Sequence, residues 1–201
     1  MEVGGDDVAR LLGCDPSDAK RTICAQLEEL LLRGGADWRL EVTVSEVAAA
    51  GEGVHLRGSC KAGTVLACYP GVVFLPDDLP VMHQLVLSGN EYVLARRDGV
   101  LLDGRPDGPS AQIFAVAQSR DRAAGVPEVC GRAFAVGNRV NHPPRGALPN
   151  VIVHPFDLMA DELPQLHPFL PVCHFRPPAV GQPSKQTAVL ISTRDLCDEE
   201  L

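Results

Sequence analysis

Aromatic side chains are scarce in this chain: Phe, Trp and Tyr together make up 4% of its 201 residues. The core must therefore be built mainly from valine, leucine and alanine. Positive charge is also in short supply, since 26 acidic side chains outnumber 18 lysines and arginines and give a formal net charge of −8. This excess of negative charge argues against the binding of nucleic-acid phosphates as the main function.

Long apolar runs and paired cysteines are missing as well. No apolar run approaches the ~20 residues of a membrane-spanning helix, and the acidic start of the sequence is unlike a signal or transit peptide. The seven cysteines form no Cys-x-x-Cys pair and are odd in number, which argues against a disulfide framework and a structural zinc site. We therefore expect reduced thiols in a nuclear or cytoplasmic protein without a metal. The loose group of His154, His167, Cys173 and His174 has no spacing that defines a tetrahedral site.

The first 35 residues carry a helical pattern. Asp15-Pro16 is a helix N-cap followed by proline at the first helical position, and Gly34-Gly35 ends the pattern. Between them, apolar residues recur at helical spacing: Ile23, Leu27, Leu30 and Leu31. We expect an N-terminal helical segment over residues 1–38, packed on a domain that spans residues 39–201.

From about residue 39 the apolar pattern changes to short runs with a period of two. Asp98-Gly99, between two apolar runs, predicts a hairpin. Residues 117–130 are polar and predict a loop. The six prolines of residues 164–183 allow short turns, or one helical turn near Leu166, and no long element. Strands are expected over residues 40–44, 64–69, 72–74, 91–97, 100–102 and 186–196. Since no strand–helix alternation is visible, the pattern predicts a mainly β protein of many short strands.

Two polar sites stand out from this pattern. Asn141-His142 lies in a segment rich in proline and glycine, and amide and imidazole groups need hydrogen-bond partners when they are buried. The residues alone favour an Asx-type turn there, with a ligand-binding loop as the alternative. Tyr69 ends a predicted strand, and taken alone it indicates a strand-end tyrosine with its hydroxyl in water. Gly51-Glu52-Gly53 predicts a tight turn before a strand, and it lacks the third glycine of a dinucleotide-binding fingerprint.

Five short motifs follow one another in a particular order. They are Gly51-Glu52-Gly53-Val54, Tyr69-Pro70-Gly71, residues 98–104, Asn141-His142 with Pro149-Asn150, and residues 188–201. In this order they resemble the SET domain family of protein-lysine methyltransferases, and most closely the branch of SET domain-containing protein 9. The resemblance covers roughly residues 45–201.

The resemblance implies a fold, a reaction and a set of site residues. The fold is α+β and mainly β, with several short sheets, a threaded C-terminal segment and the N-terminal helix. The reaction transfers a methyl group from S-adenosylmethionine to a lysine of a protein substrate, which suits a basic partner. The backbone of Glu52 and Gly53 is expected to hold the amino-acid end of the cofactor. The side-chain oxygen of Asn141 is expected to bind its amino group, and the backbone of His142 to contact the adenine. Tyr69 is expected to line the lysine channel.

Three departures from the family pattern accompany the resemblance. The family's Arg-Phe-x-Asn-His is replaced here by residues 138–142, so that Arg139 stands one residue nearer to Asn141. Pro143-Pro144 replaces the Ser-Cys whose cysteine can join a zinc cluster. The family continues after Glu-Glu-Leu to a tyrosine that closes the active site, whereas this sequence ends at Leu201. We therefore expect a SET-like domain with a truncated C-terminal end. The alternative function is a catalytically impaired SET-like module that binds without turnover.

Overall fold

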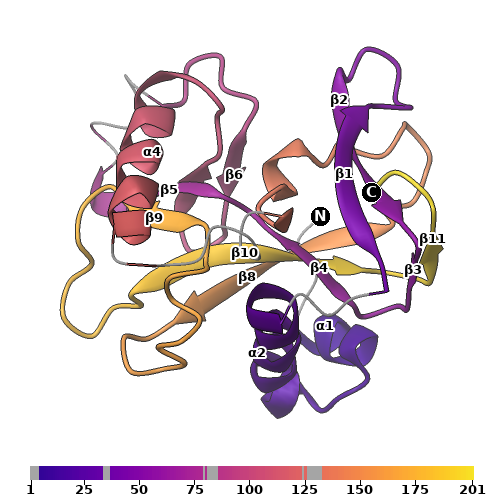
Figure 1. Cartoon of the computed structure of the whole chain (residues 1–201), viewed down its shortest axis with the longest axis horizontal. Helices are drawn as coiled ribbons and strands as arrows, with labels where there is room; N and C mark the ends of the chain where they lie inside the picture. The colour runs from indigo at the N-terminus through magenta and orange to yellow at the C-terminus, as the bar shows by residue number, and fades with distance from the viewer. Residues whose placement is uncertain (1–4, 34–36, 79, 81–85, 124, 126–132) are drawn as a thin grey trace.

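The computed structural model describes residues 5–33, 37–78, 80, 86–123, 125 and 133–201. Figure 1 shows two N-terminal helices beneath long central strands, a β-hairpin at one end of the molecule and a separate helix, α4, at the other. The described strands form four small sheets of two, three, two and four strands. This architecture confirms the expected mainly β, α+β fold with helices at the N-terminus.

The N-terminal segment forms two helices where one was expected. The helical elements are α1 (Gly5–Leu12), η1 (Pro16–Asp18), α2 (Ala19–Glu28) and η2 (Glu29–Arg33). The chain leaves α1 at Gly13, whose φ of 67° is readily adopted only by glycine. Pro16 takes the predicted first helical position, but the Asp15 side chain makes no capping hydrogen bond. The predicted stop at Gly34-Gly35 lies outside the described residues.

The helices pack on the body of the protein, as expected. Ile23 and Leu27 of α2 are 1% exposed and belong to the same core cluster as Val65 and Val189. Gln26 adds a polar link, because its side chain donates to the carbonyl of Gly63 at 3.0 Å and accepts from the amide of Val65 at 2.7 Å. The apolar face read from the sequence is therefore the face that fixes the helices to the central sheet.

The strands follow one another as short elements. They are β1 (Arg39–Val44), β2 (Glu52–Arg57), β3 (Ser59–Cys60), β4 (Val65–Cys68), β5 (Gly71–Phe74), β6 (Val93–Ala95), β7 (Leu101–Asp103), β8 (Val151–Leu158), β9 (Val172–His174), β10 (Lys185–Ser192) and β11 (Leu196–Cys197). The sheet orders are β1-β2, β4-β10-β8, β11-β3 and β6-β7-β5-β9. The predicted hairpin at Asp98-Gly99 is confirmed by the antiparallel pairing of β6 with β7.

The central strand of the molecule is β10. It pairs with β8 along its whole length, from Lys185 opposite Leu158 to Ser192 opposite Val151, and it also pairs with β4. Residues 187–192 are 0% exposed, since the strand is covered on both faces. The sequence predicted one strand to residue 196, but the chain leaves the sheet after Ser192 and pairs again only in β11.

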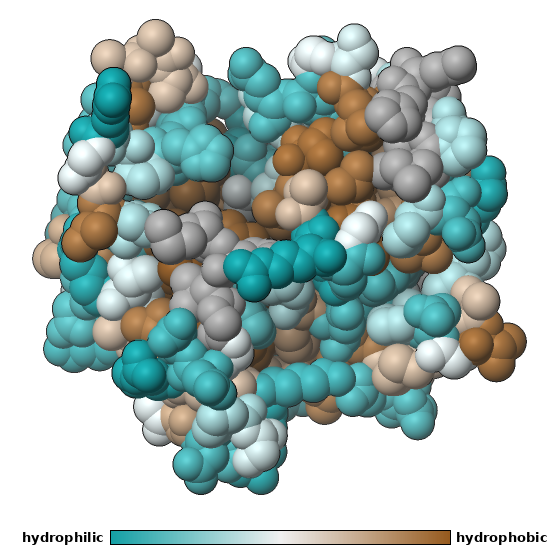
Figure 2. Space-filling model, turned by 180° about the vertical axis from the view of Figure 1, so that it is seen from behind, coloured by the Kyte–Doolittle hydropathy of each residue, from teal (hydrophilic) through white to brown (hydrophobic). Residues whose placement is uncertain are grey.

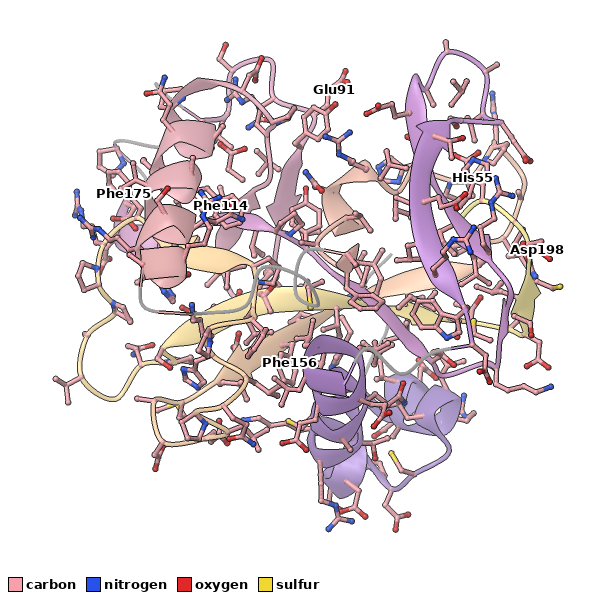
Figure 3. All side chains as sticks on the ribbon, viewed as in Figure 1. His55, Glu91, Phe114, Phe156, Phe175 and Asp198 are labelled. Atoms are coloured by element: carbon pink, nitrogen blue, oxygen red, sulfur yellow. The ribbon has the colours of Figure 1, made fainter. Side chains whose placement is uncertain are left out.

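The prediction of a loop over residues 117–130 was wrong for the part that the structure describes. The helix α4 (Gly108–Ala123) runs through most of it. Only Ser110 of α4 is buried, so the sequence shows no strong apolar stripe, although alanine, glutamine and arginine favour a helix. Phe114 extends from α4 toward the four-stranded sheet (Figure 3) and packs against the cluster around Phe74.

The face of the molecule opposite to that in Figure 1 carries both hydrophilic and apolar areas. Hydrophilic residues dominate its edges, and an apolar area occupies its upper half beside a hollow (Figure 2). Within the described ranges, no helix is long and apolar enough to cross a membrane. Residues 164–183 contain no long element, as the prolines predicted, and they form turns around Leu166. The three-residue strand β9 within them was not predicted.

Candidate functional site

Two cavities meet at one short segment, residues 138–142. The first, here called the Asn141 cavity, has a volume of about 480 Å³ and is lined by residues 46–47, 140–144, 147–153, 194 and 199–201. The second, here called the Asn138 cavity, has a volume of about 300 Å³ and is lined by residues 70–71, 103–106, 110–111, 114–115, 118, 135 and 138–139. The segment begins within η4 (Gly137–Arg139) and continues beyond its end. In Figure 1 it lies between the β1–β2 hairpin and the sheet that contains β6.

The side-chain amide of Asn141 is held by long-range contacts. Its Nδ2 donates to Ser45 Oγ at 3.1 Å, to the carbonyl of Glu52 at 3.0 Å and to Glu200 Oε1 at 3.1 Å. The self-contained Asx-type turn is therefore wrong, because these partners lie in β2, in the turn before it and in the C-terminal segment. Oδ1 of Asn141 accepts no hydrogen bond from the described residues, so the amide oxygen is left for a ligand.

Glu52 and Gly53 are placed beside Asn141 but do not line its cavity. Their expected tight turn is wrong, since both already belong to β2 and pair with Val44 and Thr43 of β1. The turn comes earlier and ends at Gly51, whose φ is 74°. The Glu52 carbonyl accepts from Asn141 at 3.0 Å. The contact of this backbone with a cofactor stays a prediction.

Gly53 allows the Glu200 carboxylate to lie directly against the backbone of β2. A Cβ atom there would lie 2.0 Å from Oε1 of Glu200 and 3.1 Å from Nδ2 of Asn141. The neighbouring Glu52 side chain turns away from this contact and forms an ion pair with Arg139. The Gly-Glu-Gly motif therefore serves the close approach of Glu200, a residue that we did not single out from the sequence.

His142 is exposed and lines the Asn141 cavity. The structure thus brings two of the five predicted site residues, Asn141 and His142, to one cavity. The predicted contact of His142 with adenine stays a prediction.

Tyr69 lies apart from that cavity, and its hydroxyl is not in water as the residue alone suggested. Tyr69 is 7% exposed, and its hydroxyl donates to the carbonyl of Tyr92 at 2.7 Å. Burial, and next the negative charge of Asp103, raise the pKa of the Tyr69 phenol, which keeps it neutral. Its ring packs against Gly104, where a Cβ would be 3.1 Å from Tyr69 Cε1. Since Gly104 lines the Asn138 cavity, Tyr69 supports the wall of that cavity.

Asp103 gives the Asn138 cavity a buried negative charge. It is 1% exposed, and its Oδ1 accepts from Asn90 Nδ2 at 2.8 Å and from the amide of Arg105 at 3.1 Å. Among the residues that the structure describes, the second oxygen, Oδ2, has no hydrogen-bond partner, and neither has the buried Oδ1 of Asn138. Such acceptors are uncommon in folded proteins and mark a place where a donor fits.

The C-terminal segment closes the other side of the Asn141 cavity. The Leu201 amide donates to the carbonyl of Val54 at 2.8 Å, and Asn150 Nδ2 donates to the carbonyl of Glu200 at 2.6 Å. The backbone of His55, on β2, forms an isolated antiparallel β-bridge with Glu200. His55 lies beside the yellow C-terminal end of the chain (Figure 3). The C-terminal segment therefore lies against Asn141 and Asn150, and its threading through a loop stays a prediction.

Glu200 is held in its charged form by hydrogen bonds from distant segments. Its burial opposes the charged form, but hydrogen bonds from Ser45, from Asn141 and from the amide of Glu46 outweigh this effect and lower the pKa of the Glu200 carboxyl. Within the described ranges, no three His, Cys, Asp or Glu side chains are placed to hold a metal ion.

Comparison with known proteins gives two relatives. SET domain-containing protein 9 of Homo sapiens is 28% identical over 161 residues, which cover 76% of this chain and 52% of that protein. SET domain-containing protein 9 of Pongo abelii is 29% identical over 136 residues, which cover 63% of this chain and 49% of that protein. The chain thus spans about half the length of the curated relatives that it matches. No protein-family model matches the chain.

Proposed function

Because the chain is related to the SET domain family, we propose that it is a methyltransferase that uses S-adenosylmethionine and acts on a lysine of a protein substrate. The cofactor occupies the Asn141 cavity, and the lysine side chain reaches the Asn138 cavity. The observation that carries the proposal is that residues 138–142 line both cavities. Two ligands placed in these cavities would be brought next to each other by one segment.

The residues of the Asn141 cavity fit the cofactor. Its volume of about 480 Å³ lies within the range of about 300–1,000 Å³ that is usual for small-molecule sites. Oδ1 of Asn141 is an acceptor for the amino group, and the backbone of His142 is proposed to hold the adenine. The backbone of Glu52 and Gly53 is proposed to hold the amino-acid end from beside Asn141, outside the lining of the cavity. When bound, S-adenosylmethionine supplies a methyl group on a positively charged sulfur that a neutral amine can attack.

The chain's own residues contribute alignment and the exclusion of water, which are the main needs of such a transfer. Tyr69, fixed by its hydrogen bond to Tyr92 and kept neutral by burial, holds the wall of the lysine site in one position. The carboxylate of Asp103, a buried residue in the lining of the Asn138 cavity, favours a donor group such as the substrate amine at that wall. The net charge of −8 favours approach of a basic protein substrate.

A binding module without turnover is the second candidate function. The hydroxyl of Tyr69 is already bonded to Tyr92 and the residue is 7% exposed, so this phenol does not reach into the cavity. A radiolabelled-methyl assay with lysine-rich peptides separates the two functions. Transfer supports the enzyme, and cofactor binding without transfer supports the module.

Replacing Asn141 with alanine should weaken the binding of S-adenosylhomocysteine tenfold or more. A hydrogen bond to a charged group contributes roughly 1.5–3 kcal/mol, which corresponds to that factor. Isothermal calorimetry measures the two dissociation constants. The matched control is Gln112→Ala, which removes an exposed amide of α4 outside both cavities and should leave binding unchanged. A wild-type protein that gives neither heat nor a thermal shift with the ligand would contradict the cofactor site.

A further inference from the structure

Glu200 stands at the wall of the Asn141 cavity without a role in the proposed reaction. We propose that Glu200 is a positioning residue: by holding Nδ2 of Asn141, it presents the amide oxygen to the ammonium group of the bound cofactor. This inference rests on the proposed function. It adds a specificity determinant for ligands that carry the amino-acid end.

The Glu200 carboxylate is fixed at both of its oxygens. Oε1 accepts from Ser45 Oγ at 2.6 Å and from Asn141 Nδ2 at 3.1 Å, and Oε2 accepts from the amide of Glu46 at 2.6 Å. The side chain is 8% exposed, and Nε2 of His55 lies 3.8 Å from Oε2. The backbone of residues 200–201 is held by Asn150 and β2. The carboxylate therefore cannot turn away from Asn141 without losing several contacts.

The orientation of the Asn141 amide follows from these contacts. An amide has one donating end and one accepting end, and here three acceptors surround the donating end. If the amide turned over, its oxygen would face the negative Glu200 oxygen and the carbonyl oxygen of Glu52. Because hydrogen bonds to a charged acceptor are roughly twice as strong as neutral ones, Glu200 contributes most to this choice. The amide oxygen is then the atom left to accept from a cationic group.

A different role for Glu200 makes different predictions. If it only ties the C-terminal segment to the β1–β2 turn, its loss should lower the melting temperature and weaken every ligand of the cavity alike. If it touches the ammonium itself, its effect should add to that of Asn141. The experiment therefore uses two ligands, S-adenosylhomocysteine and 5′-methylthioadenosine, which lacks the amino-acid end.

The central variant is Glu200→Gln. A glutamine amide at this place brings a second NH₂ group against either the amide of Glu46 or Nδ2 of Asn141, so the three donors cannot all be satisfied. Calorimetry should show S-adenosylhomocysteine binding weakened tenfold or more and 5′-methylthioadenosine binding changed less than twofold. The control Glu199→Gln removes the adjacent charge, which pairs with Arg194 at the same cavity, and should change the preference between the two ligands less than twofold.

A double variant tests whether Glu200 acts through Asn141. If it does, Asn141→Ala combined with Glu200→Gln should bind S-adenosylhomocysteine no more weakly than Asn141→Ala alone. Additive losses, or equal losses for both ligands, would overturn the inference. Ser45→Ala, which removes the hydroxyl shared by Glu200 and Asn141, should show the same selective loss at smaller size. It replaces Glu200→Gln if that variant does not fold.

The outcome for the wild-type protein separates this inference from the proposed function. Wild-type binding with an unchanged Glu200→Gln variant overturns the positioning role alone. Failure of the wild type to bind either ligand overturns the cofactor site, and the positioning role with it.

Discussion

Replacing Gly71 with alanine should lower the free energy of unfolding by about 2–6 kcal/mol, the sum of backbone strain and overpacking. Gly71 has a φ of 135°, a region that side-chain-bearing residues rarely adopt. An added Cβ would also lie 2.1 Å from the carbonyl oxygen of Asp103. The contact joins the backbones of the paired strands β5 and β7, so neither strand can move away without disturbing the sheet.

The matched control is Gly51→Ala. Gly51 also has a positive φ, 74°, but nothing lies within 4 Å of the added Cβ, so only the backbone cost of about 1–2 kcal/mol remains. Urea denaturation, followed by circular dichroism, measures both variants. Equal losses for the two glycines would contradict the close approach of Gly71 to Asp103. The consequence for function is direct, because Gly71 and Asp103 both line the Asn138 cavity.

Replacing Arg96 with methionine should cost about 3 kcal/mol of unfolding free energy, the lower end of the range for breaking a buried ion pair. The Arg96 side chain is 4% exposed and donates to Asp98, to Asp157 and to the carbonyl of Thr187. It thereby joins the β6–β7 hairpin to β8 and β10. The loss lies at the lower end of that range because the carboxylates left without Arg96 are still partly exposed to water. Asp98 is 47% exposed and Asp157 is 33% exposed, so water can hydrate both charges.

The pH dependence of this loss has a defined sign. Burial raises the pKa of Asp98, but the hydrogen bonds and charge of Arg96 outweigh it, and the net effect is a pKa below the usual value of 3.8. The Arg96–Asp98 pair therefore contributes fully to the free energy of unfolding at pH values above 3.8. This contribution is lost as the pH falls through the lowered pKa of the folded state. The stability difference between Arg96→Met and the wild type should shrink in acid, below the usual Asp98 value of 3.8. A difference that stays constant would contradict the ion pair.

The control for Arg96 is Lys61→Met. Lys61 pairs with Asp195 through side chains that are 86% and 62% exposed, and such surface pairs contribute little to stability. Both variants remove one positive charge and keep an apolar stem of similar length. If both variants lose a similar free energy of unfolding, burial is not the reason that the Arg96 ion pairs stabilise the protein.

Local patterns were enough to predict much of the fold. The run that became β10 is apolar over residues 188–191, and Asp98-Gly99 marks a hairpin without reference to any other part of the chain. The helix α4 was missed because its residues are mostly exposed and carry no apolar stripe. The break at Gly13 was missed because the apolar spacing continues on both sides of it.

The site could be predicted only in part, for a physical reason. Asn141 and His142 are adjacent and stand out in a polar loop, so the sequence found them. Glu200 is 59 positions from Asn141, and Ser45 is 96 positions from it, so no local pattern could join them. The hydrogen bond of the Tyr69 hydroxyl could not be predicted either, because its acceptor is the carbonyl of Tyr92, 23 positions away in the sequence. Contacts between distant segments decide what each polar group can bind.

The most direct test of the account is to find where the cofactor binds. Ultraviolet crosslinking of S-adenosylmethionine carrying a labelled methyl group, followed by peptide mapping, reports the contacting segment. The account predicts label on peptides that contain residues 140–153 or 194–201, which line the Asn141 cavity, and loss of that label when excess S-adenosylhomocysteine is present. Label confined to α4 or to residues 103–106 at the Asn138 cavity, or label that excess ligand does not displace, would contradict it.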